Sequence, residues 1–192
     1  MAKLALMLTD GFAEWEYALI GGVGKPFYGL DVQYFAPEAG ELCSQGGLRA
    51  QISQDFATLL EWQPTALVVV GGMIWESDNA PDVSTLLKAA YESGASVGGI
   101  CGGTLALARA GLLDDVAHTS NDKSFLKKNA VCYRGEAHYR ASPSAVSSDR
   151  VITAPGAAPA SFAAAIFTAA GLPRDVVSQF EEMMAAEHGK HA

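Results

Sequence analysis

Residues 96–104 read Ser-Val-Gly-Gly-Ile-Cys-Gly-Gly-Thr, and this stretch decides the fold that we expect. Its first five residues are small or apolar, as in a strand buried on both faces of a parallel sheet. The glycines on either side of Cys101 allow a sharp turn into a helix over 102–110, with the cysteine projecting from the sheet edge. The pattern G-x-C-x-G corresponds to the G-x-S-x-G nucleophile elbow of hydrolases. A small, packed and inert cysteine beside a helix is the alternative.

Strands and helices alternate along the rest of the chain. The expected strands are residues 4–8, 31–36, 66–70, 96–100 and 151–154, and the expected helices are 13–23, 84–91, 102–110, 161–170 and 175–186. A small hairpin is expected over 41–53. This alternation predicts an α/β fold with a mostly parallel sheet and helices on both faces. Sites in such folds lie beyond the carboxyl ends of the strands, so the residues that follow each strand are the candidates.

Composition and charge exclude several classes of protein. The chain has 192 residues, of which 49% are apolar, and a net charge of −8, which excludes a disordered chain. An acidic chain without a basic run favours neither nucleic acid nor an anionic membrane as a partner. The apolar runs 4–8 and 66–70 are five residues long. A signal peptide needs roughly 7–15 and a spanning helix about 20, so we expect a cytoplasmic protein.

The cysteines form no C-x-x-C pair. Their odd number, with Cys43, Cys101 and Cys132, indicates free thiols in a reducing compartment. We expect Cys43 to be half-buried in the hairpin and Cys132 to lie in the core, because it alternates with apolar residues. Glu136 and His138 are two residues apart without a third ligand, so we expect neither a metal nor a cofactor.

Gly71-Gly72 follows the expected strand 66–70 and ends at the same sheet edge as Cys101. Its backbone N–H groups are free to face the thiol, and with the N–H of Gly102 they would form an oxyanion hole. The helix that begins after Cys101 should lower the pKa of the thiol through its dipole. A plain glycine turn between strand and helix is the alternative for Gly71-Gly72.

Two carboxylates, Glu14 and Glu16, begin the helix that follows the first strand. Residues two apart on a helix point roughly 200° apart, so only one of them can face the sheet edge. Glu16 has apolar neighbours, and burial there would raise its pKa and let it donate a hydrogen bond to a thiolate. Glu14 is then the solvated carboxylate. Alternatively, both acids only complement the helix dipole.

Cys101 on its turn, Gly71-Gly72 and Glu16, in this order and spacing, resemble the DJ-1/PfpI superfamily. The resemblance covers nearly the whole chain and includes the Ala-Gly-Leu-Leu helix end at residues 110–113. It implies a flavodoxin-like three-layer sandwich shared with class I glutamine amidotransferases. It also implies one domain, which we place over 1–186, and a homodimer. The last residues, 187–192, are expected to form a frayed tail.

The resemblance also assigns roles to residues. It implies that Cys101 is the reactive cysteine, that Glu16 is the carboxyl group that contacts its sulfur, and that Gly72 and Gly102 supply the N–H pair. The chain departs from the family pattern at two positions. Gly102 stands where PfpI-like hydrolases have a histidine, which makes protease activity less expected. Asn121 stands where other members have a histidine about twenty residues after the cysteine.

His118 is the remaining candidate for a base, since it lies three residues before Asn121. It would serve as a third catalytic residue if it reached Cys101; the alternative is a histidine satisfied locally by its own strand or loop. Acyl transfer by a cysteine without a histidine lacks the usual proton shuttle.

Three functions remain open. The first is an enzyme whose cysteine attacks small carbonyl or acyl compounds, with glyoxalase-like or amidase-like activity. The second is a non-enzymatic stress protein that senses oxidants through Cys101, which would oxidise to sulfenate or sulfinate. The third is a glutaminase, which needs a downstream H-x-E where residues 136–138 read Glu-Ala-His. The expected partners are therefore a small-molecule substrate or an oxidant.

Overall fold

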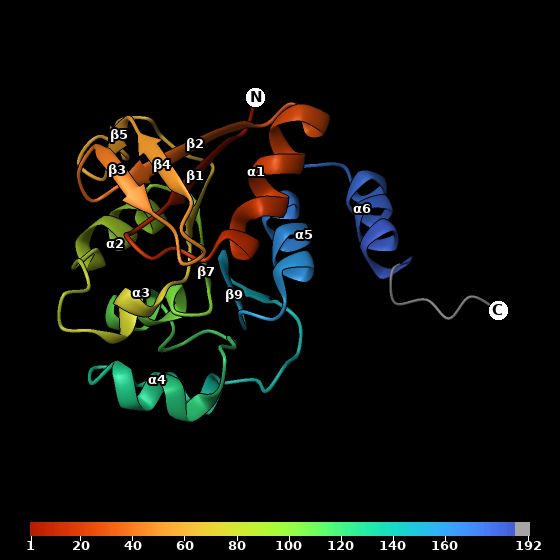
Figure 1. The fold of residues 1–192 in the computed structure, drawn as a ribbon. Helices are drawn as coiled ribbons and strands as arrows, with labels where there is room; N and C mark the ends of the chain where they lie inside the picture. The colour runs from red at the N-terminus through yellow and green to blue at the C-terminus, as the bar shows by residue number, and fades with distance from the viewer. Residues whose placement is uncertain (187–192) are drawn as a thin grey trace.

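A seven-stranded sheet forms the middle layer of the structure, a computed structural model that describes residues 1–186 (Figure 1). The strand order is β5-β2-β1-β6-β7-β9-β8. Neighbouring strands are parallel except β8 and β9, which pair antiparallel. The strands are β1 (Lys3–Met7), β2 (Asp31–Ala36), β5 (Gln54–Asp55), β6 (Ala66–Val69), β7 (Ser96–Ile100), β8 (Val146–Ser148) and β9 (Val151–Ala154).

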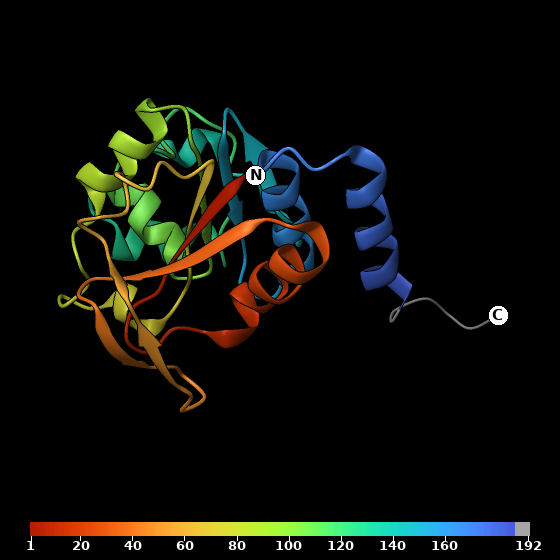
Figure 2. The same ribbon diagram turned by 90° about the horizontal axis from the view of Figure 1, so that it is seen from above.

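Helices cover both faces of this sheet. On one face lie α1 (Glu14–Tyr28), α5 (Pro159–Ala169) and α6 (Arg174–Ala186). On the other lie α2 (Ser84–Glu92), α3 (Gly103–Arg109) and α4 (Lys123–Asn129). Figure 2 shows α6 outside α5, as an outer element of its layer. The flavodoxin-like three-layer α/β architecture expected from the sequence is therefore confirmed, whereas the predicted tail, 187–192, lies outside the described residues.

Two shorter features complete the fold. The hairpin expected over 41–53 is present as β3 (Gly40–Cys43) and β4 (Arg49–Ile52), which pair antiparallel apart from the main sheet. Single turns of 3-10 helix, η1 (Met73–Glu76) and η2 (Gly135–His138), follow β6 and α4. Both lie in the connections near the carboxyl ends of the strands, where the site is formed.

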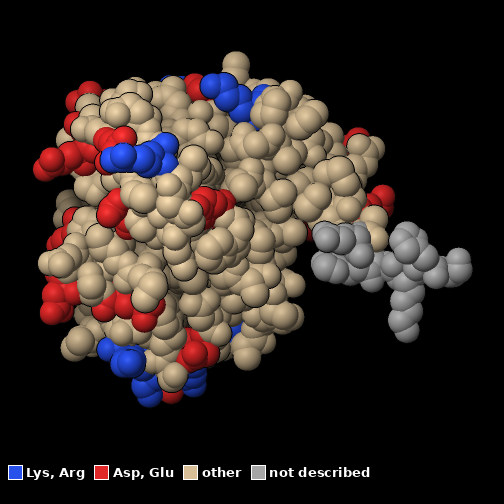
Figure 3. All heavy atoms as spheres, in the orientation of Figure 1, with Lys and Arg blue, Asp and Glu red and all other residues tan. Residues whose placement is uncertain are grey.

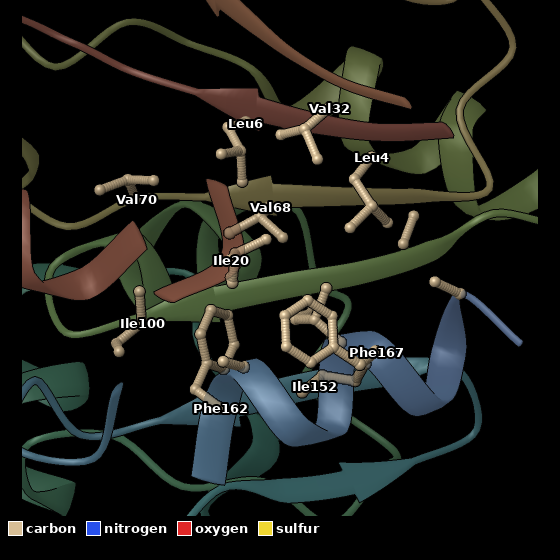
Figure 4. Packing of buried hydrophobic residues seen from close by; sticks show 14 of the residues in the cluster. Leu4, Leu6, Ile20, Val32, Val68, Val70, Ile100, Ile152, Phe162 and Phe167 are labelled. Carbon is tan, nitrogen blue, oxygen red and sulfur yellow. The ribbon is translucent and has the colours of Figure 1, made fainter. Parts of the chain in front are cut away.

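The core consists of two apolar layers, one on each side of the sheet. Figure 4 shows the layer beneath α1 and α5, where side chains of β1, β6 and α5 meet. Its fully buried members include Leu4, Leu6, Val68, Phe162 and Phe167. Burial of such a side chain stabilises the fold by about 1.5–3 kcal/mol, so these layers hold the strand ends in fixed positions.

The expected position of Cys132 in the core is wrong. The segment 130–133 is a turn after α4, and in it Cys132 and Val131 are both exposed. The apolar neighbours that suggested a core position are Ala130, which is buried at the end of α4, and Tyr133, which is half-buried. Cys43 is exposed as well, rather than half-buried, because it lies on the outer side of the hairpin.

Figure 3 shows acidic side chains mainly on the left half of the visible face, with uncharged residues covering much of the rest. Lys and Arg gather at the lower end of this face, over α4, which contributes Lys123, Lys127 and Lys128. Within residues 1–186, no helix is both long and apolar enough to span a membrane.

Candidate active site

Cys101 occupies the turn between β7 and α3 in the left-handed backbone region, with φ 53°. A residue with a Cβ adopts this conformation at a cost of order 1–3 kcal/mol, and such strain is concentrated at functional sites. Gly102 and Gly103 follow Cys101, and neither has a positive φ. Both must be glycine because other backbone atoms lie too close to leave room for a Cβ. A Cβ on Gly102 would lie 2.7 Å from the Gly72 carbonyl oxygen, and one on Gly103 would overlap the carbonyl oxygen of Val69. The turn therefore packs directly against the end of β6.

Glu16 reaches this turn from the first turns of α1 and is 1% exposed. Its Oε2 accepts a hydrogen bond of 2.7 Å from the N–H of Gly71. Its Oε1 has no hydrogen-bond partner among the described residues. A Cβ on Gly156 would lie 2.9 Å from the Cys101 Sγ and 3.2 Å from this Oε1, so both atoms border the same small space. Glu16 is thus buried against the cysteine, as its apolar sequence neighbours predicted.

Burial changes the protonation of both groups. It raises the pKa of Glu16 from 4.5 to about 7, an effect that interactions with the Cys101 thiol and the Gly71 N–H only partly offset. Burial, followed by the charge of Glu16, raises the pKa of the Cys101 thiol from 9.0 to about 11. Groups in such contact titrate as a pair, so between these values the pair holds one proton and one negative charge.

The N-terminus of α3 lowers the thiol pKa through the Gly102 N–H, as expected, but the net shift of that pKa is upward. Burial and the Glu16 charge outweigh the opposing hydrogen bonds from Asn121 and from the Gly102 N–H. The sulfur nevertheless has these two donors around it, whereas the Glu16 carboxyl has only the Gly71 N–H. These two donors stabilise the charge that the sulfur carries once its proton has moved to Oε1, so they lower the free energy of that arrangement.

Asn121 lies in the loop before α4, and its side chain contacts the sulfur. Its Nδ2 donates a hydrogen bond of 3.3 Å to the Cys101 Sγ, and its Oδ1 accepts one of 3.0 Å from the Gly156 N–H. The sequence comparison placed Asn121 at the position of the family's usual histidine but did not include it among the site residues. Its spacing of twenty residues from the cysteine was the signal that would have found it.

His118 is not brought to the cysteine, and its inclusion among the catalytic residues is corrected on this ground. It is fully buried, with Nδ1 2.8 Å from the carbonyl oxygen of Val116 and Nε2 2.7 Å from the hydroxyl of Tyr133. Burial lowers the pKa of His118, which keeps the ring neutral. The locally satisfied histidine, considered as the alternative, describes this geometry.

Gly72 and Gly102 lie side by side beneath the cysteine. A Cβ on Gly102 would lie 3.3 Å from the Gly72 nitrogen, and the Gly102 N–H is a hydrogen-bond donor toward the sulfur. Trp75 fixes this loop from below, because its Nε1 donates a 2.9 Å hydrogen bond to the Val70 carbonyl oxygen in a fully buried position. The four predicted residues Cys101, Glu16, Gly72 and Gly102 are thus gathered at one sheet edge.

Gly156, which follows β9, forms the opposite wall. Its carbonyl oxygen accepts a 3.1 Å hydrogen bond from Trp15 Nε1, and its N–H is bound by Asn121. A side chain at Gly156 would press on the sulfur.

A groove of about 680 Å³ adjoins Asn121 and is large enough for a small molecule. The groove is lined by Ser120, Asn121, Asp122, Lys123, Tyr139, Ala141, Ser142 and Pro143.

Glu14 binds the hairpin instead of lying free in solvent. Its Oε1 accepts hydrogen bonds from the Ser44 hydroxyl and, at 3.0 Å, from the Gly46 N–H. The bond from Ser44 is the main cause that lowers the pKa of Glu14. Glu14 and Glu16, two residues apart, therefore have pKa values displaced in opposite directions because one is held by donors and the other is buried.

Elsewhere in the described chain, Glu41 and Glu136 form ion pairs. Glu136 lies 3.0 Å from both Lys123 and Lys127 of α4, so the Glu-Ala-His segment is engaged there. Residues 1–186 contain no group of three His, Cys, Asp or Glu side chains placed to hold a metal ion.

Comparison with known proteins gives relatives of similar length. The chain is 33% identical over 172 residues to YoaZ of Bacillus subtilis, which is named an uncharacterized protease; the match covers 84% of this chain and 80% of the relative. A second Bacillus subtilis protein with that description, YdeA, is 27% identical over 163 residues, with the same coverage.

Solved structures agree in fold over almost the entire chain. The DJ-1 superfamily protein Atu0886 from Agrobacterium tumefaciens superposes with a TM-score of 0.92 at 36% identity, covering 98% of this chain and 100% of its own. A ThiJ/PfpI family protein from Bacillus anthracis gives a TM-score of 0.83 at 26% identity, with 99% and 91% covered. The family model described as DJ-1/PfpI matches residues 2–169, from β1 to the end of α5. The elbow, the buried glutamate and this match agree, and the chain belongs to the DJ-1/PfpI family.

Proposed function

We propose that this protein is a cysteine-dependent enzyme that acts on small carbonyl or acyl compounds. One observation carries the proposal: the Cys101 Sγ and a Glu16 Oε1 that has no hydrogen-bond partner in the described chain border the same small buried space, where burial raises the pKa of Glu16 to about 7. A nucleophile and a proton carrier in contact are the two groups that addition to a carbonyl requires.

The proposed reaction uses the thiol proton twice. The thiol proton passes to Glu16, and Sγ forms a bond to the carbonyl carbon while the π electrons move to the oxygen. The N–H groups of Gly72 and Gly102 bind that oxygen as it becomes negative. Glu16 then returns the proton to the oxygen and leaves a neutral hemithioacetal.

With an α-oxoaldehyde, this adduct isomerises to an α-hydroxy thioester as the C1 proton moves to C2 and the hydroxyl proton to the neighbouring oxygen, and water hydrolyses the thioester to a 2-hydroxy acid and the free thiol. With an acyl substrate, the tetrahedral oxyanion re-forms the C=O bond as the bond to the leaving group breaks, Glu16 gives its proton to the leaving group, and water hydrolyses the resulting thioester to the acid and the free thiol.

Aldehydes suit this site better than peptides. Addition to an aldehyde needs one proton, which Glu16 carries from the sulfur to the oxygen, and no leaving group. Glu16 has a pKa of about 7, near the pH at which a proton carrier works best. Peptide hydrolysis also needs a proton for the leaving amine and a base that activates water. Asn121 occupies the position where a histidine would serve as that base, and an amide does not titrate.

A second candidate function is redox sensing, and the Asn121 amide favours it because it donates a hydrogen bond without competing for a proton. In this reaction the sulfur attacks one oxygen of a peroxide, the O–O bond breaks, and the departing hydroxide takes a proton to become water. Cys101 is left as a sulfenic acid. The absent side chain at Gly156 leaves room beside the sulfur for the added oxygen.

Turnover of a small α-oxoaldehyde by wild type, Cys101→Ser and Glu16→Gln tests the enzyme proposal, with Cys132→Ser as a matched control on an exposed thiol. We expect no turnover by Cys101→Ser and a loss of about 10²–10⁴-fold for Glu16→Gln, the range of general acid–base catalysis. Cys132→Ser should match wild type. If wild type turns over no aldehyde but its Cys101 gains oxygen in mild peroxide, the enzyme proposal is refuted and the redox-sensor proposal is supported.

We further propose a homodimer in the cytoplasm, which rests on family membership. Light scattering coupled to size-exclusion chromatography measures the mass directly. A value of twice 20.1 kDa supports the dimer, and 20.1 kDa contradicts it.

A further inference from the structure

The loop that carries Asn121 is held rigidly on its N-terminal side. The Thr104 hydroxyl donates a 2.6 Å hydrogen bond to the Cys101 carbonyl oxygen, which uses its one proton. The 2.7 Å hydrogen bond between Thr104 and Ser120 must therefore be donated by Ser120. Both hydroxyls are buried, at 0% and 1% exposure. Ser120 is thus anchored to the same turn as the cysteine, one residue before Asn121.

The loop is held equally on its other side. Asp122 caps α4, because its Oδ1 accepts hydrogen bonds of 2.8 Å from the Phe125 N–H and 2.6 Å from the Ser124 hydroxyl. The backbone of Asn121 therefore lies between two anchored neighbours. Asn121 itself is exposed, and its hydrogen bonds to Cys101 and Gly156 hold its side chain against the sulfur.

The orientation of the Asn121 amide follows from its partners. The Gly156 N–H is a donor, so the atom that faces it at 3.0 Å is the amide oxygen. The amide nitrogen then faces the Cys101 Sγ at 3.3 Å. Rotating the amide by half a turn would set two donors against each other at Gly156 and a negative oxygen against the sulfur. Gly156 is itself fixed by Trp15, so the amide has one favourable orientation.

We propose that Asn121 is a catalytic residue, a hydrogen-bond donor of fixed orientation that stabilises the anionic sulfur of Cys101 and never removes its proton. A hydrogen bond to a charged acceptor is stronger than one between neutral groups, so this donor favours the arrangement with charge on sulfur and the proton on Glu16. Proton transfer is then left to Glu16 alone. Asn121 sets how much of the shared charge lies on the nucleophile, for either of the two proposed functions.

The rate of Cys101 alkylation by iodoacetamide between pH 6 and 10, resolved by peptide mass spectrometry, tests this role. The variants are Asn121→Ala, which removes the donor, and Asn121→Asp, which keeps an acceptor for Gly156 but turns a carboxylate toward the sulfur. Asn129→Ala is the matched control, because Asn129 also holds this segment through a 3.0 Å hydrogen bond to the Phe125 carbonyl oxygen. Exposed Cys43 and Cys132 serve as internal references.

At pH 8 we expect Asn121→Ala to slow Cys101 alkylation about threefold to tenfold, the effect of losing one hydrogen bond to a charged group that water partly replaces. Asn121→Asp should slow it further, and Asn129→Ala should leave it unchanged. The proposal is overturned if Asn121→Ala reacts like wild type, if only the aspartate slows the reaction, or if Asn129→Ala slows it equally. Asn121→Asp retains the acceptor for the Gly156 N–H and so keeps the loop in place. If the alanine variant loses the loop structure, an Asn121→Asp variant that reacts like wild type overturns the proposal.

This experiment needs no substrate, and its outcome is therefore separable from the proposed enzyme function. Absence of aldehyde turnover in wild type, with alkylation slowed by Asn121→Ala, refutes the enzyme and retains the donor. Normal turnover in wild type, with alkylation unaffected in both Asn121 variants, refutes the donor and retains the enzyme.

Discussion

Replacing the buried Glu16 by glutamine should change how the stability of the fold depends on pH. The glutamine side chain has nearly the same shape, and its amide oxygen still accepts the hydrogen bond from the Gly71 N–H. What the substitution removes is a carboxyl whose pKa is raised by burial to about 7. The slope of the unfolding free energy against pH, rather than its value at one pH, isolates this change.

The sign follows from proton counting. Between pH 4.5 and about 7 the folded state holds the Glu16 proton that the unfolded state has lost, so stability falls as pH rises across this window. The pKa difference corresponds to a loss of roughly 3 kcal/mol, at about 1.4 kcal/mol for each tenfold change in proton affinity. Glu16→Gln has no carboxyl at this position, so its unfolding free energy does not fall in this way as pH rises. Relative to wild type, it should therefore gain about 3 kcal/mol between pH 5 and pH 8, or roughly 6–12 °C in Tm.

Urea unfolding at pH 5, 6, 7 and 8, at one protein concentration, measures this difference. Glu14→Gln is the matched control, since the pKa of Glu14 is lowered by its bond from Ser44. A lowered pKa stabilises the fold above pH 4.5, and that stability is lost only at more acid pH, so this variant should be less stable than wild type by an amount that stays constant from pH 5 to 8. If the Glu16→Gln and wild-type curves run parallel within about 1 kcal/mol, the carboxyl ionises as it does in water and the buried shared proton does not exist.

Three further outcomes are expected. Gly156→Ala should slow Cys101 alkylation at least about tenfold while Cys43 and Cys132 react normally, because the new Cβ would lie 2.9 Å from Sγ. Peptide mass spectrometry measures these rates, and an unchanged Cys101 rate would show that residue 156 moves away from the sulfur. The Cys101 alkylation rate in wild type should rise through about pH 7, as the pair loses its first proton, and a rise only near pH 11 would place the shared charge on Glu16. His118→Ala should destabilise the fold by about 2 kcal/mol through its two lost buried hydrogen bonds, yet reduce aldehyde turnover less than about tenfold; a hundredfold loss with folding intact would restore a cysteine–histidine pair.

Much of the fold was predictable because its signals are local. The strands 96–100 and 151–154 were placed at their observed bounds, since buried parallel strands are short apolar runs. The two-residue β5 and the edge strand β8 were missed, because edge strands are short and carry no continuous apolar run. The helix α1 extends past the expected residue 23 to Tyr28 and contains Pro26, since packing in the layer overrides the local propensity to stop.

The site was predictable only in part, for a different reason. The positions of Cys101 and Glu16 follow from spacing along single elements, and the structure brings them together. The side-chain directions at residues 118–121 depend on partners further along the chain. The Tyr133 hydroxyl forms a hydrogen bond with the His118 ring, and the Gly156 N–H donates one to the Asn121 amide oxygen. The pKa of the cysteine likewise depends on burial and on a carboxylate from another element, which the helix after it does not reveal.

The outer position of α6 implies that this helix unfolds locally, before the rest of the fold does. This helix packs mainly on α5, and only Val177 and Phe180 of its side chains are buried. Its principal contact is the edge-to-face stacking of Phe180 on Phe167, with ring centroids 5.3 Å apart. Two buried side chains stabilise α6 far less than the four buried residues of β1 and the four of β6 stabilise those strands. Native-state hydrogen exchange should therefore resolve a subglobal unit in which the amides of α6 exchange through an opening of lower free energy than those of the central strands.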